Sequence, residues 1–315
     1  MIVVAGEALV DLILHPDLRL TAVAGGGPFN TARTIGRLEG EVAFVGRLST
    51  DRFGSMLRDE LEADRVDLTL ATATEAPTTL AVAELDASGA ATYRFHTAET
   101  SAPGLDLDAV LAAIGHGPEA LHVGTLGLVL EPMATALSAG VARLADDTLL
   151  MVDPNCRPRV IADRDAYLAR LTTVLGRADI VKVSGDDLAY MAPTRSAIDS
   201  ARSLLALGPR VVLLTDGAHA VWALGHDFEA ELPVPPVVVV DTVGSGDAFG
   251  GAFLAWWVER GSGRDGLADE AAVTEATTHA IEVASLTCGR PGADPPTRTE
   301  AGWPVRRLGP DPDGR

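Results

Sequence analysis

Short runs of apolar, often β-branched residues alternate with amphipathic stretches along most of the chain. IVVAG at residues 2–6 precedes PFNTARTIGRLEG, and EVAFVG at residues 41–46 precedes TDRFGSMLRDELEAD. Later apolar runs, each with a helical pattern beside it, are ALHVG, TLLMVD, DIVKVS and RVVLLTD. Apolar strands separated by helices are typical of a parallel sheet that is covered on both faces. The pattern therefore predicts an α/β fold with a central, mostly parallel sheet flanked by helices.

Two segments break this alternation. LILHPDLRLTAVA at residues 12–24 and TTLAVAELDASGAATYRFH at residues 78–96 have strand patterns without helical partners. The second predicts a hairpin that turns at residues 86–89. Its period of two sorts the side chains into two faces, with Tyr93 and Phe95 on one and Arg94 and His96 on the other. We predict that both segments form a small β-sheet lid on the α/β body.

The lid strands are predicted as insertions into a single domain of residues 1–300. No internal repeat or low-complexity stretch divides this range. Residues 301–315 are rich in Pro, Gly, Asp and Arg and have little to bury, which predicts a flexible tail.

Composition restricts the partners. The chain has 315 residues, 47% of them hydrophobic, which is enough for a large core, and its formal net charge is −19. An acidic surface repels nucleic acid and anionic membranes, so small molecules are the expected ligands. Cys156 and Cys288 are not spaced as a metal pair. The apolar N-terminal segment contains Glu7 and Asp11 and has no basic leader, so we expect neither a signal peptide nor a membrane span, and a cytoplasmic location.

Lysine occurs once in the chain, at Lys182. Neither a P-loop, GxxxxGK[ST], nor the lysine-bearing strand of a protein kinase can be built around it. Phosphate chemistry is therefore expected to use backbone amides and arginine. A dinucleotide-binding Rossmann enzyme is also disfavoured, because no GxGxxG lies between the first strand and the first helix.

The segment DTVGSGDAFGGAF, residues 241–253, suggests an anion site. Gly244, Ser245 and Gly246 precede Asp247 and an apolar helix, whose first-turn N–H groups lack partners within the helix. A carboxylate there would repel a stored phosphate, but it suits a base that removes a proton beside a phosphoryl group. The alternative is that Asp247 only stabilises the helix N-terminus.

A second glycine cluster lies in AGGGPFNTARTIGRLEG, residues 24–40. Pro28 is expected at the first helical position and Asn30 inside the first turn. The amide of Asn30 beside exposed glycine backbone suits a polyhydroxylated ligand, and Asp11, expected at the end of the first strand, could bind two hydroxyls. The alternative is that Asn30 only caps the helix and Asp11 only ends the strand.

These two segments resemble the signature regions of the ribokinase-like sugar kinases, also called the phosphofructokinase B family, and the similarity extends over about residues 2–293. The resemblance implies a Rossmann-like body with a β-sheet lid, and transfer of the ATP γ-phosphoryl group to a sugar hydroxyl with Mg²⁺ as helper. It implies that Asp247 is the catalytic base. The amides of Val243 to Asp247, those of Gly244, Ser245 and Gly246 included, would form an anion hole. Sugar ligands would be Asp11, Gly26, Gly27 and Asn30.

Other matches suggest where the nucleotide binds. VVLLTDGAHAVWAL resembles the family's TxGxxG strand and turn, which gives Thr215 and Gly217, although Ala220 replaces the second glycine. ASLTCGRPGA resembles the segment near adenine. Gly292 and Ala293 would line that slot, with Cys288 as a packing residue.

DIVKVSGDDL resembles the family's NxxE segment, which organises Mg²⁺ and phosphates. Both side chains are shorter here, as Ser184 and Asp187. A water-bridged Mg²⁺ at Asp187 is one interpretation. In the other, Ser184 is a helix N-cap and Asp187 a first-turn acid.

VDPNCRPRV places Asp153, Asn155 and Arg157 after a strand, where open α/β sheets bind ligands. With GEALVDLI, it resembles the fructokinase and 2-keto-3-deoxygluconate kinase branch. Arg157 would stabilise phosphoryl charge or contact the substrate, unless it is a solvated loop residue. A sugar acid would need a second arginine, for which Arg94 is the candidate. Fructose or a related ketose is the expected substrate, and the sugar acid is the alternative.

Further expectations concern alternative functions, assembly and a monovalent cation. A ribokinase or a nucleoside kinase stays an alternative, the latter because of Tyr93 and Phe95, and so does a sugar sensor that has lost catalysis. The resemblance implies a homodimer through the lids. It also implies K⁺ near Asp241.

Overall fold

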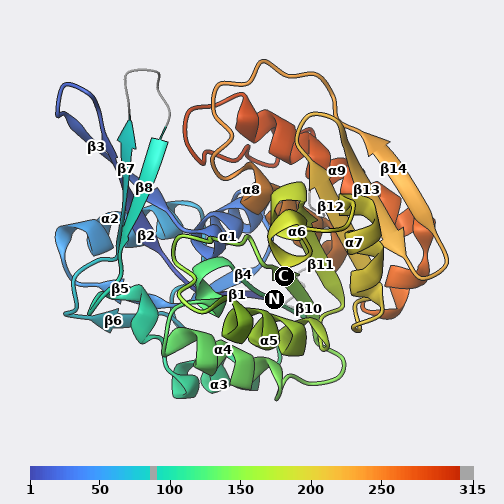
Figure 1. Cartoon of the computed structure of the whole chain (residues 1–315), viewed down its shortest axis with the longest axis horizontal. Coiled ribbons are helices and arrows are strands. Elements are labelled where there is room, and N and C mark those ends of the chain that lie inside the picture. The colour runs from blue at the N-terminus through green and yellow to red at the C-terminus, as the bar shows by residue number, and fades with distance from the viewer. Residues whose placement is uncertain (86–90, 306–315) are drawn as a thin grey trace, which may run out of the picture.

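A computed structural model describes residues 1–85 and 91–305 (Figure 1). Its centre is an eight-stranded sheet in which the six strands from β12 to β4 are parallel and β13 and β14 extend it in antiparallel pairings. This confirms the predicted α/β fold with a mostly parallel sheet. The order of strands is β14 (Glu229–Pro233), β13 (Ala220–Gly225), β12 (Val211–Asp216), β11 (Ile180–Ser184), β10 (Leu149–Asp153), β9 (Ala120–Gly124), β1 (Ile2–Ala5) and β4 (Val42–Val45).

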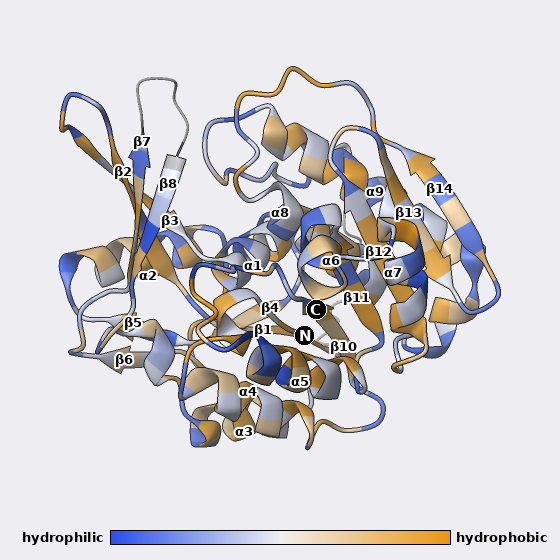
Figure 2. Ribbon diagram, in the orientation of Figure 1, coloured by the Kyte–Doolittle hydropathy of each residue, from blue (hydrophilic) through white to orange (hydrophobic). Residues whose placement is uncertain are grey.

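The central strands are apolar because both faces of the sheet are buried. All four residues of β1 and all five of β10 are buried. Along β10, Leu149 and Met151 pack into the core on one face, while Leu150 and Val152 pack into the core on the other. Figure 2 shows the hydrophobic residues concentrated on these strands and on the inward sides of the helices.

Nine α-helices of the described chain cover the sheet. One face packs against α1 (Gly27–Arg37), α2 (Arg52–Ala63), α8 (Ser245–Glu259) and α9 (Glu270–Cys288). The other packs against α3 (Leu107–Gly115), α4 (Met133–Val141), α5 (Arg164–Leu175), α6 (Gly185–Met191) and α7 (Ala197–Leu205). Short 3₁₀ turns are η1 (Ala102–Gly104), η2 (Thr125–Leu128) and η3 (Asp265–Ala268). In this part of the chain no helix combines the length and hydropathy that a membrane span requires.

A second, four-stranded sheet rises beside the body and forms the lid (Figure 1). Its order is β3 (Leu20–Gly25), β2 (Leu9–Leu14), β7 (Leu80–Leu85) and β8 (Ala91–His96). The small predicted sheet is therefore confirmed. A separate parallel pair links β5 (Arg47–Ser49) to β6 (Thr72–Thr74).

The lid differs from its predicted pattern in one respect that matters for the site. The first lid segment begins at Leu9, and a turn that starts at His15 divides it, where Leu18 has φ +65°. Since β1 ends at Ala5, Asp11 lies within the lid strand β2 and not at the end of the first strand. The predicted hairpin turn at residues 86–89 and most of the predicted tail lie outside the described residues.

Candidate active site

A cavity of about 790 Å³ opens where the lid meets the carboxyl ends of the parallel strands. Open α/β sheets bind ligands at this edge. The cavity brings together most of the predicted site residues, namely Asp11, Gly26, Gly27, Asn30, Asn155, Arg157, Ser184, Asp187, Val243, Gly244, Gly246 and Asp247. It also contains Tyr93 and Phe95, which share one face of the hairpin.

The N-terminus of α8 is built to bind an anion. Gly244, its N-cap, has φ +76°, a conformation that favours glycine, and a Cβ there would lie 2.4 Å from Cβ of Ala293. The N–H of Ala248 donates to the carbonyl of Gly244 at 2.8 Å. The amides of Gly246 and Asp247 come before this first hydrogen bond of the helix, so they have no acceptor within the helix. Both residues line the cavity. Ser245 instead donates from its N–H and its Oγ to the carbonyl of Thr242.

Asp247 and Asn30 come from different helices and meet in the cavity. Nδ2 of Asn30 donates to Oδ2 of Asp247 at 2.9 Å. Within the described structure Oδ1 of Asn30, although buried, has no partner, so it can accept a hydrogen bond from a ligand hydroxyl. Burial raises the pKa of Asp247 to about 7, and the charge of Asp153 adds to this, while Asn30 and Lys182 oppose it. A carboxyl group with such a pKa suits a base that works near neutral pH.

Glu7 is a site residue that the sequence pattern did not assign. It is fully buried, and it accepts hydrogen bonds from the amides of Gly27 at 3.3 Å and Gly127 at 3.0 Å. Burial raises its pKa to about 8, and the nearby charge of Asp247 contributes. Glu7 therefore fixes the glycine turn beside Asn30. The sequence feature that could have identified Glu7 is an acidic residue directly after the first apolar strand, in AGEALV.

Lys182, the single lysine, also lines the cavity. Its Nζ donates to Oδ2 of Asp153 at 3.0 Å, and it lies 2.7 Å from where a Cβ on Gly246 would be. Burial alone would lower the pKa of Lys182, but the carboxylates around it, first Asp153, raise it overall, so the ammonium stays charged. The expectation that only backbone and arginine would meet a phosphate is therefore incomplete. A charged residue within the apolar strand IVKVS was the available signal.

Asp153 lies behind the cavity wall, not at its surface, because its side chain is turned toward Lys182. Its exposure is 3%, and its Oδ1 has no partner within the described structure. Asn155, two residues further, does line the cavity, in a left-handed conformation with φ +38°. Non-glycine residues with positive φ are uncommon and often occur at functional sites.

The lid contributes Asp11 opposite α8. Burial raises the pKa of Asp11 to about 6, while the charge of Arg157 acts in the other direction. Arg157 lines the cavity and, within the described chain, has no carboxylate within 4.0 Å. Its guanidinium is therefore available to an anionic ligand.

Arg94 does not reach the cavity. It lies on the outer face of β8, where its Nε donates to Oε1 of Glu84 at 2.9 Å and its side chain is 66% exposed. The reason is the period of two in a strand, which turns Tyr93 and Phe95 inward and Arg94 outward. Arg159 lines the cavity instead. The expected carboxylate-binding role of Arg94 is therefore not supported.

Ser184 and Asp187 form a capping box at the start of α6. Asp187 Oδ2 accepts from the N–H of Ser184 at 2.8 Å and from its Oγ at 2.6 Å, while Oδ1 accepts from the N–H of Cys156 at 2.6 Å. Both carboxylate oxygens thus accept backbone hydrogen bonds, which fixes Asp187 as a helix cap. In the described residues no group of three or more His, Cys, Asp or Glu side chains could hold a metal ion.

The remaining predicted residues lie beside the cavity. Thr215 pairs with Ser184 across the neighbouring strands, and Gly217 follows with φ +53° and open space around it. Gly292 donates to Oδ2 of Asp241 at 2.9 Å, and Oδ1 of Asp241 accepts from Val243 at 3.0 Å. Backbone amides thus bind both oxygens of Asp241 and fix this carboxylate beside the turn.

Together these residues can remove a proton from a hydroxyl group beside a bound anion. Asp247 supplies the base, the amides of α8 supply dipoles, and Lys182 and Arg157 supply positive charge. Asp11, Asn30 and the glycine backbone supply partners for the hydroxyl groups of the same ligand.

Comparisons with known proteins agree with this arrangement. The model of the pfkB family carbohydrate kinases matches residues 1–300. A fructokinase of Rhizobium leguminosarum bv. trifolii is 34% identical over 81% of this chain and 79% of its own, and fructokinase-1 of Zea mays is 31% identical over 96% and 95%. The crystal structure of a fructokinase with bound ATP from Xylella fastidiosa superposes with a TM-score of 0.88 at 28% identity, covering 95% of this chain and 96% of that one.

Proposed function

Because the chain belongs to the pfkB family of carbohydrate kinases and is a sugar kinase, we propose that it transfers the γ-phosphoryl group of ATP to a hydroxyl of fructose. The observation that carries this proposal is Asp247, which lies in the first turn of α8 and is bonded to Asn30. The fructokinase relatives and the ATP-bound structural neighbour support the choice of substrates.

In the proposed reaction the carboxylate of Asp247 accepts the proton of the attacking hydroxyl. The sugar oxygen bonds to the γ-phosphorus as the bond to the β–γ bridging oxygen breaks, and ADP leaves. Phosphoryl transfer needs positioning and charge stabilisation above all. The amides of Gly246 and Asp247, with Lys182 and Arg157, would meet the charge on the transferring group. Asp11 and Asn30 would hold the sugar.

ATP would enter as its Mg²⁺ complex, with the ion as part of the substrate. The capping box of Ser184 and Asp187 supports a structural role for these two residues, with contact to the ion only through water. Gly292 and Ala293 remain proposed contacts of the nucleotide, since they pack beside the anion-binding turn. Thr215 and Gly217 remain proposed contacts too, since Thr215 pairs with Ser184, which lines the cavity. A monovalent cation near Asp241 is also proposed, since this carboxylate is bonded to Val243 beside the anion-binding turn.

The proposal is tested by ATP consumption with fructose, 2-keto-3-deoxygluconate, ribose, glucose and adenosine. Turnover of fructose with the highest kcat/KM supports it. Preference for the sugar acid would assign Arg157 and Arg159, both in the cavity, to its carboxylate. Sugar binding without turnover of any substrate would support a sensor and contradict the kinase proposal.

The pH dependence of kcat/KM should follow the protonation of Asp247. Its pKa is raised to about 7, so the base is mostly protonated below pH 6. We expect kcat/KM to fall about tenfold per pH unit below this pKa and to level off above it, since kcat/KM reports the free protein. Initial rates from pH 5 to 9 at constant ionic strength would measure it. A flat profile between pH 5 and 7 would contradict the assignment of Asp247 as the base.

Two arginines provide a matched pair of substitutions. Arg157→Met should lower kcat/KM by about 10²-fold, because it removes a charge that faces the transferring group. Arg94→Met should leave kcat/KM within about twofold, because its exposed ion pair with Glu84 contributes little. Steady-state kinetics of both variants would measure this. A larger loss for Arg94 than for Arg157 would restore the discarded role of Arg94.

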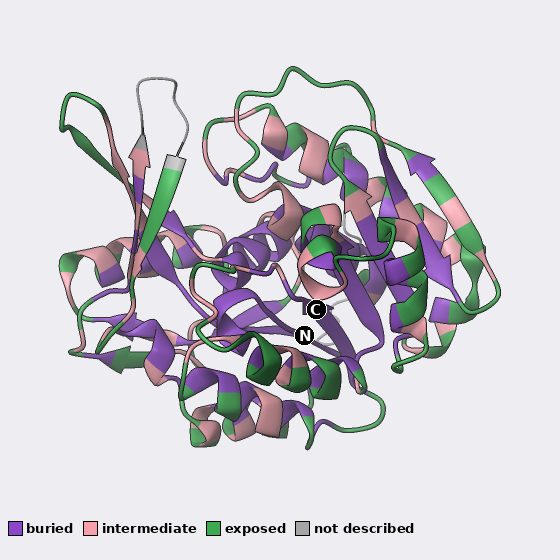
Figure 3. Cartoon of the chain, in the orientation of Figure 1, coloured by how far each residue is buried: buried purple, intermediate pink, exposed green. Residues whose placement is uncertain are grey.

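We also propose a homodimer through the lid. Much of its edge strand β8 is exposed (Figure 3), and edge strands of small sheets are usually covered or paired. Light scattering at concentrations well above those of the assays should give about twice the chain mass. A monomer under those conditions would refute the dimer without affecting the proposed reaction.

A further inference from the structure

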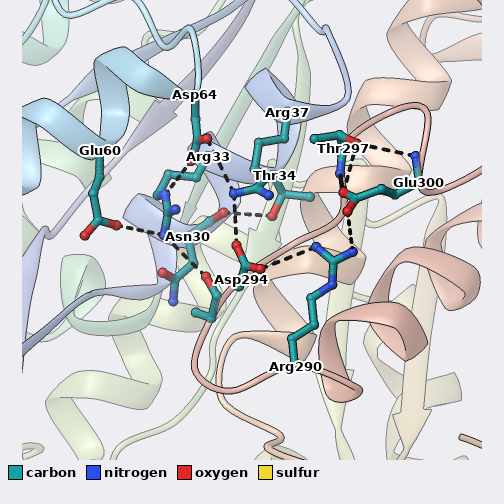
Figure 4. A network of polar contacts seen from close by, with 11 residues as sticks. Asn30, Arg33, Thr34, Arg37, Glu60, Asp64, Arg290, Asp294, Thr297 and Glu300 are labelled. Carbon is teal, nitrogen blue, oxygen red and sulfur yellow. Dashed lines mark hydrogen bonds and ion pairs between the residues drawn. The ribbon is translucent and has the colours of Figure 1, made fainter.

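An ion-pair cluster that the proposed chemistry does not use joins α1, α2 and the segment after α9 (Figure 4). Its centre is Arg33 on α1, which is 9% exposed. Nε of Arg33 donates to Oδ2 of Asp64 at 2.6 Å, and Nη1 lies 3.1 Å from Oε2 of Glu60. Nη1 also donates to the carbonyl of Ala293 at 3.3 Å. One buried guanidinium thus joins α1, the end of α2 and the loop that follows α9.

Arg33 is one turn from the sugar side of the cavity. It follows Asn30 by three residues, so the two side chains leave α1 on the same face. Asn30 lines the cavity and donates to Asp247. A ligand hydroxyl that donates a hydrogen bond to Oδ1 of Asn30 would therefore fix the turn of α1 that carries Arg33.

The loop that Arg33 holds packs against the anion-binding turn. Ala293 packs on the N-cap of α8 so closely that a Cβ on Gly244 would lie 2.4 Å from its own Cβ. The N–H of Gly292 donates to Oδ2 of Asp241 at 2.9 Å. The position of Ala293 therefore decides where the anion-binding turn lies.

Other ion pairs anchor this loop without reaching the carbonyl of Ala293. Nη1 of Arg37 is 2.9 Å from Oδ1 of Asp294, and Arg290 pairs with Asp294 at 3.4 Å and with Glu300 at 2.9 Å. These contacts hold Asp294 and the following segment. Of the ion-paired arginines in Figure 4, Arg33 is the one that donates to Ala293 itself.

We propose that Arg33 is a positioning residue that couples sugar binding near Asn30 to nucleotide binding near Gly244 and Ala293. A sugar that fixes α1 also fixes the loop through Arg33, so the nucleotide meets an ordered turn and binds more tightly. Linkage requires the nucleotide to raise the sugar affinity by the same factor. The inference rests on the proposed function, because it takes the two ligands from it.

The test measures the Kd of ADP by calorimetry with and without saturating fructose. For the wild-type chain we expect the sugar to lower this Kd by about 5- to 150-fold, the usual range of coupling between sites. In Arg33→Met the ratio should fall to within about twofold of one, while each ligand alone keeps its Kd within about threefold. An unchanged ratio in the variant, or a ratio of one in the wild type, would overturn the proposal.

Arg298→Met is the matched control. Arg298 is 4% exposed, pairs with Glu259 at 2.7 Å and donates to the carbonyl of Leu38 at 3.0 Å, at the far end of α1. It should keep the coupling ratio, and loss of the ratio here would mean general loosening and overturn the role of Arg33. If Arg33→Met does not fold, Asp64→Asn, which weakens the hydrogen bond that holds Nε of Arg33, should also lower the ratio, and a wild-type ratio there would overturn the proposal.

Turnover by the wild-type chain is measured first, so that a failure of the proposed substrate is recorded separately. The coupling is then measured with the sugar that is turned over. A chain that turns over no sugar overturns both proposals. Normal turnover of fructose with no change of coupling in Arg33→Met overturns this inference alone.

Discussion

Asp247→Asn is expected to lower kcat by about 10⁴-fold, the upper range for loss of a general base. The amide cannot accept the hydroxyl proton, but its oxygen can still accept the hydrogen bond of Asn30, which in the wild type joins Nδ2 to Oδ2 at 2.9 Å. The Kd of ADP should therefore stay within a few-fold of the wild-type value. Single-turnover kinetics together with calorimetry would separate the two effects.

The same variant should be more stable than the wild type at high pH. Because the pKa of Asp247 is raised in the folded state to about 7, its stabilising contribution is complete below the unfolded value of 3.8. It is lost as pH rises through about 7, and Asn has no such loss. The Tm difference should therefore grow from pH 5 to pH 8. A less stable variant, or one that keeps a tenth of the wild-type kcat, would argue against Asp247 as a buried base.

Lys182→Met is expected to have the second-largest effect. It removes a buried cation that lies next to Gly246, so kcat should fall by about 10²–10³-fold, as for loss of one donor to a transition-state anion. It also leaves Asp153 buried without a partner, and breaking a buried ion pair typically costs about 3–5 kcal/mol. Denaturant unfolding and steady-state kinetics would measure the two losses.

A double variant separates them. In Lys182→Met/Asp153→Asn both members of the ion pair are replaced by uncharged side chains, so most of the stability should return, because uncharged replacements of buried pairs are often neutral. The activity should not return, because the cation is still missing. Recovery of both would mean that Lys182 acts only through stability and has no role in the reaction.

The fold could be predicted from the sequence because its signals are local. The apolar runs at β1, β10 and β11 need two covered faces, and a strand with that requirement fits few architectures. The period of two in β8 is enough by itself to separate Tyr93 and Phe95, which line the cavity, from Arg94, which does not. The sequence pattern placed Asp11 at the end of the first strand because it does not divide β1 from β2. The strongest turn signal between the two strands is Gly6, which does not predict that a new strand begins at Leu9.

Site residues could be predicted from the sequence only where all the residues that define their role lie in one short segment. The turn at Gly244 to Asp247 is such a segment, and the structure brings Gly244, Gly246 and Asp247 to the cavity. Glu7 and Lys182 were missed because their importance depends on partners 120 and 29 residues away, at Gly127 and Asp153. Pairings of that kind are set by strand order, which the linear pattern does not contain.

The burial of Lys182 has a consequence for the chemistry of the protein surface. Reducing sugars and their phosphates glycate free amines, and a kinase that releases a ketose phosphate is continuously exposed to such reagents. The chain carries its only ε-amine 4% exposed and bound to Asp153, and its other basic side chains are arginines and histidines. The surface therefore offers no lysine to glycation, acetylation or amine-reactive labels.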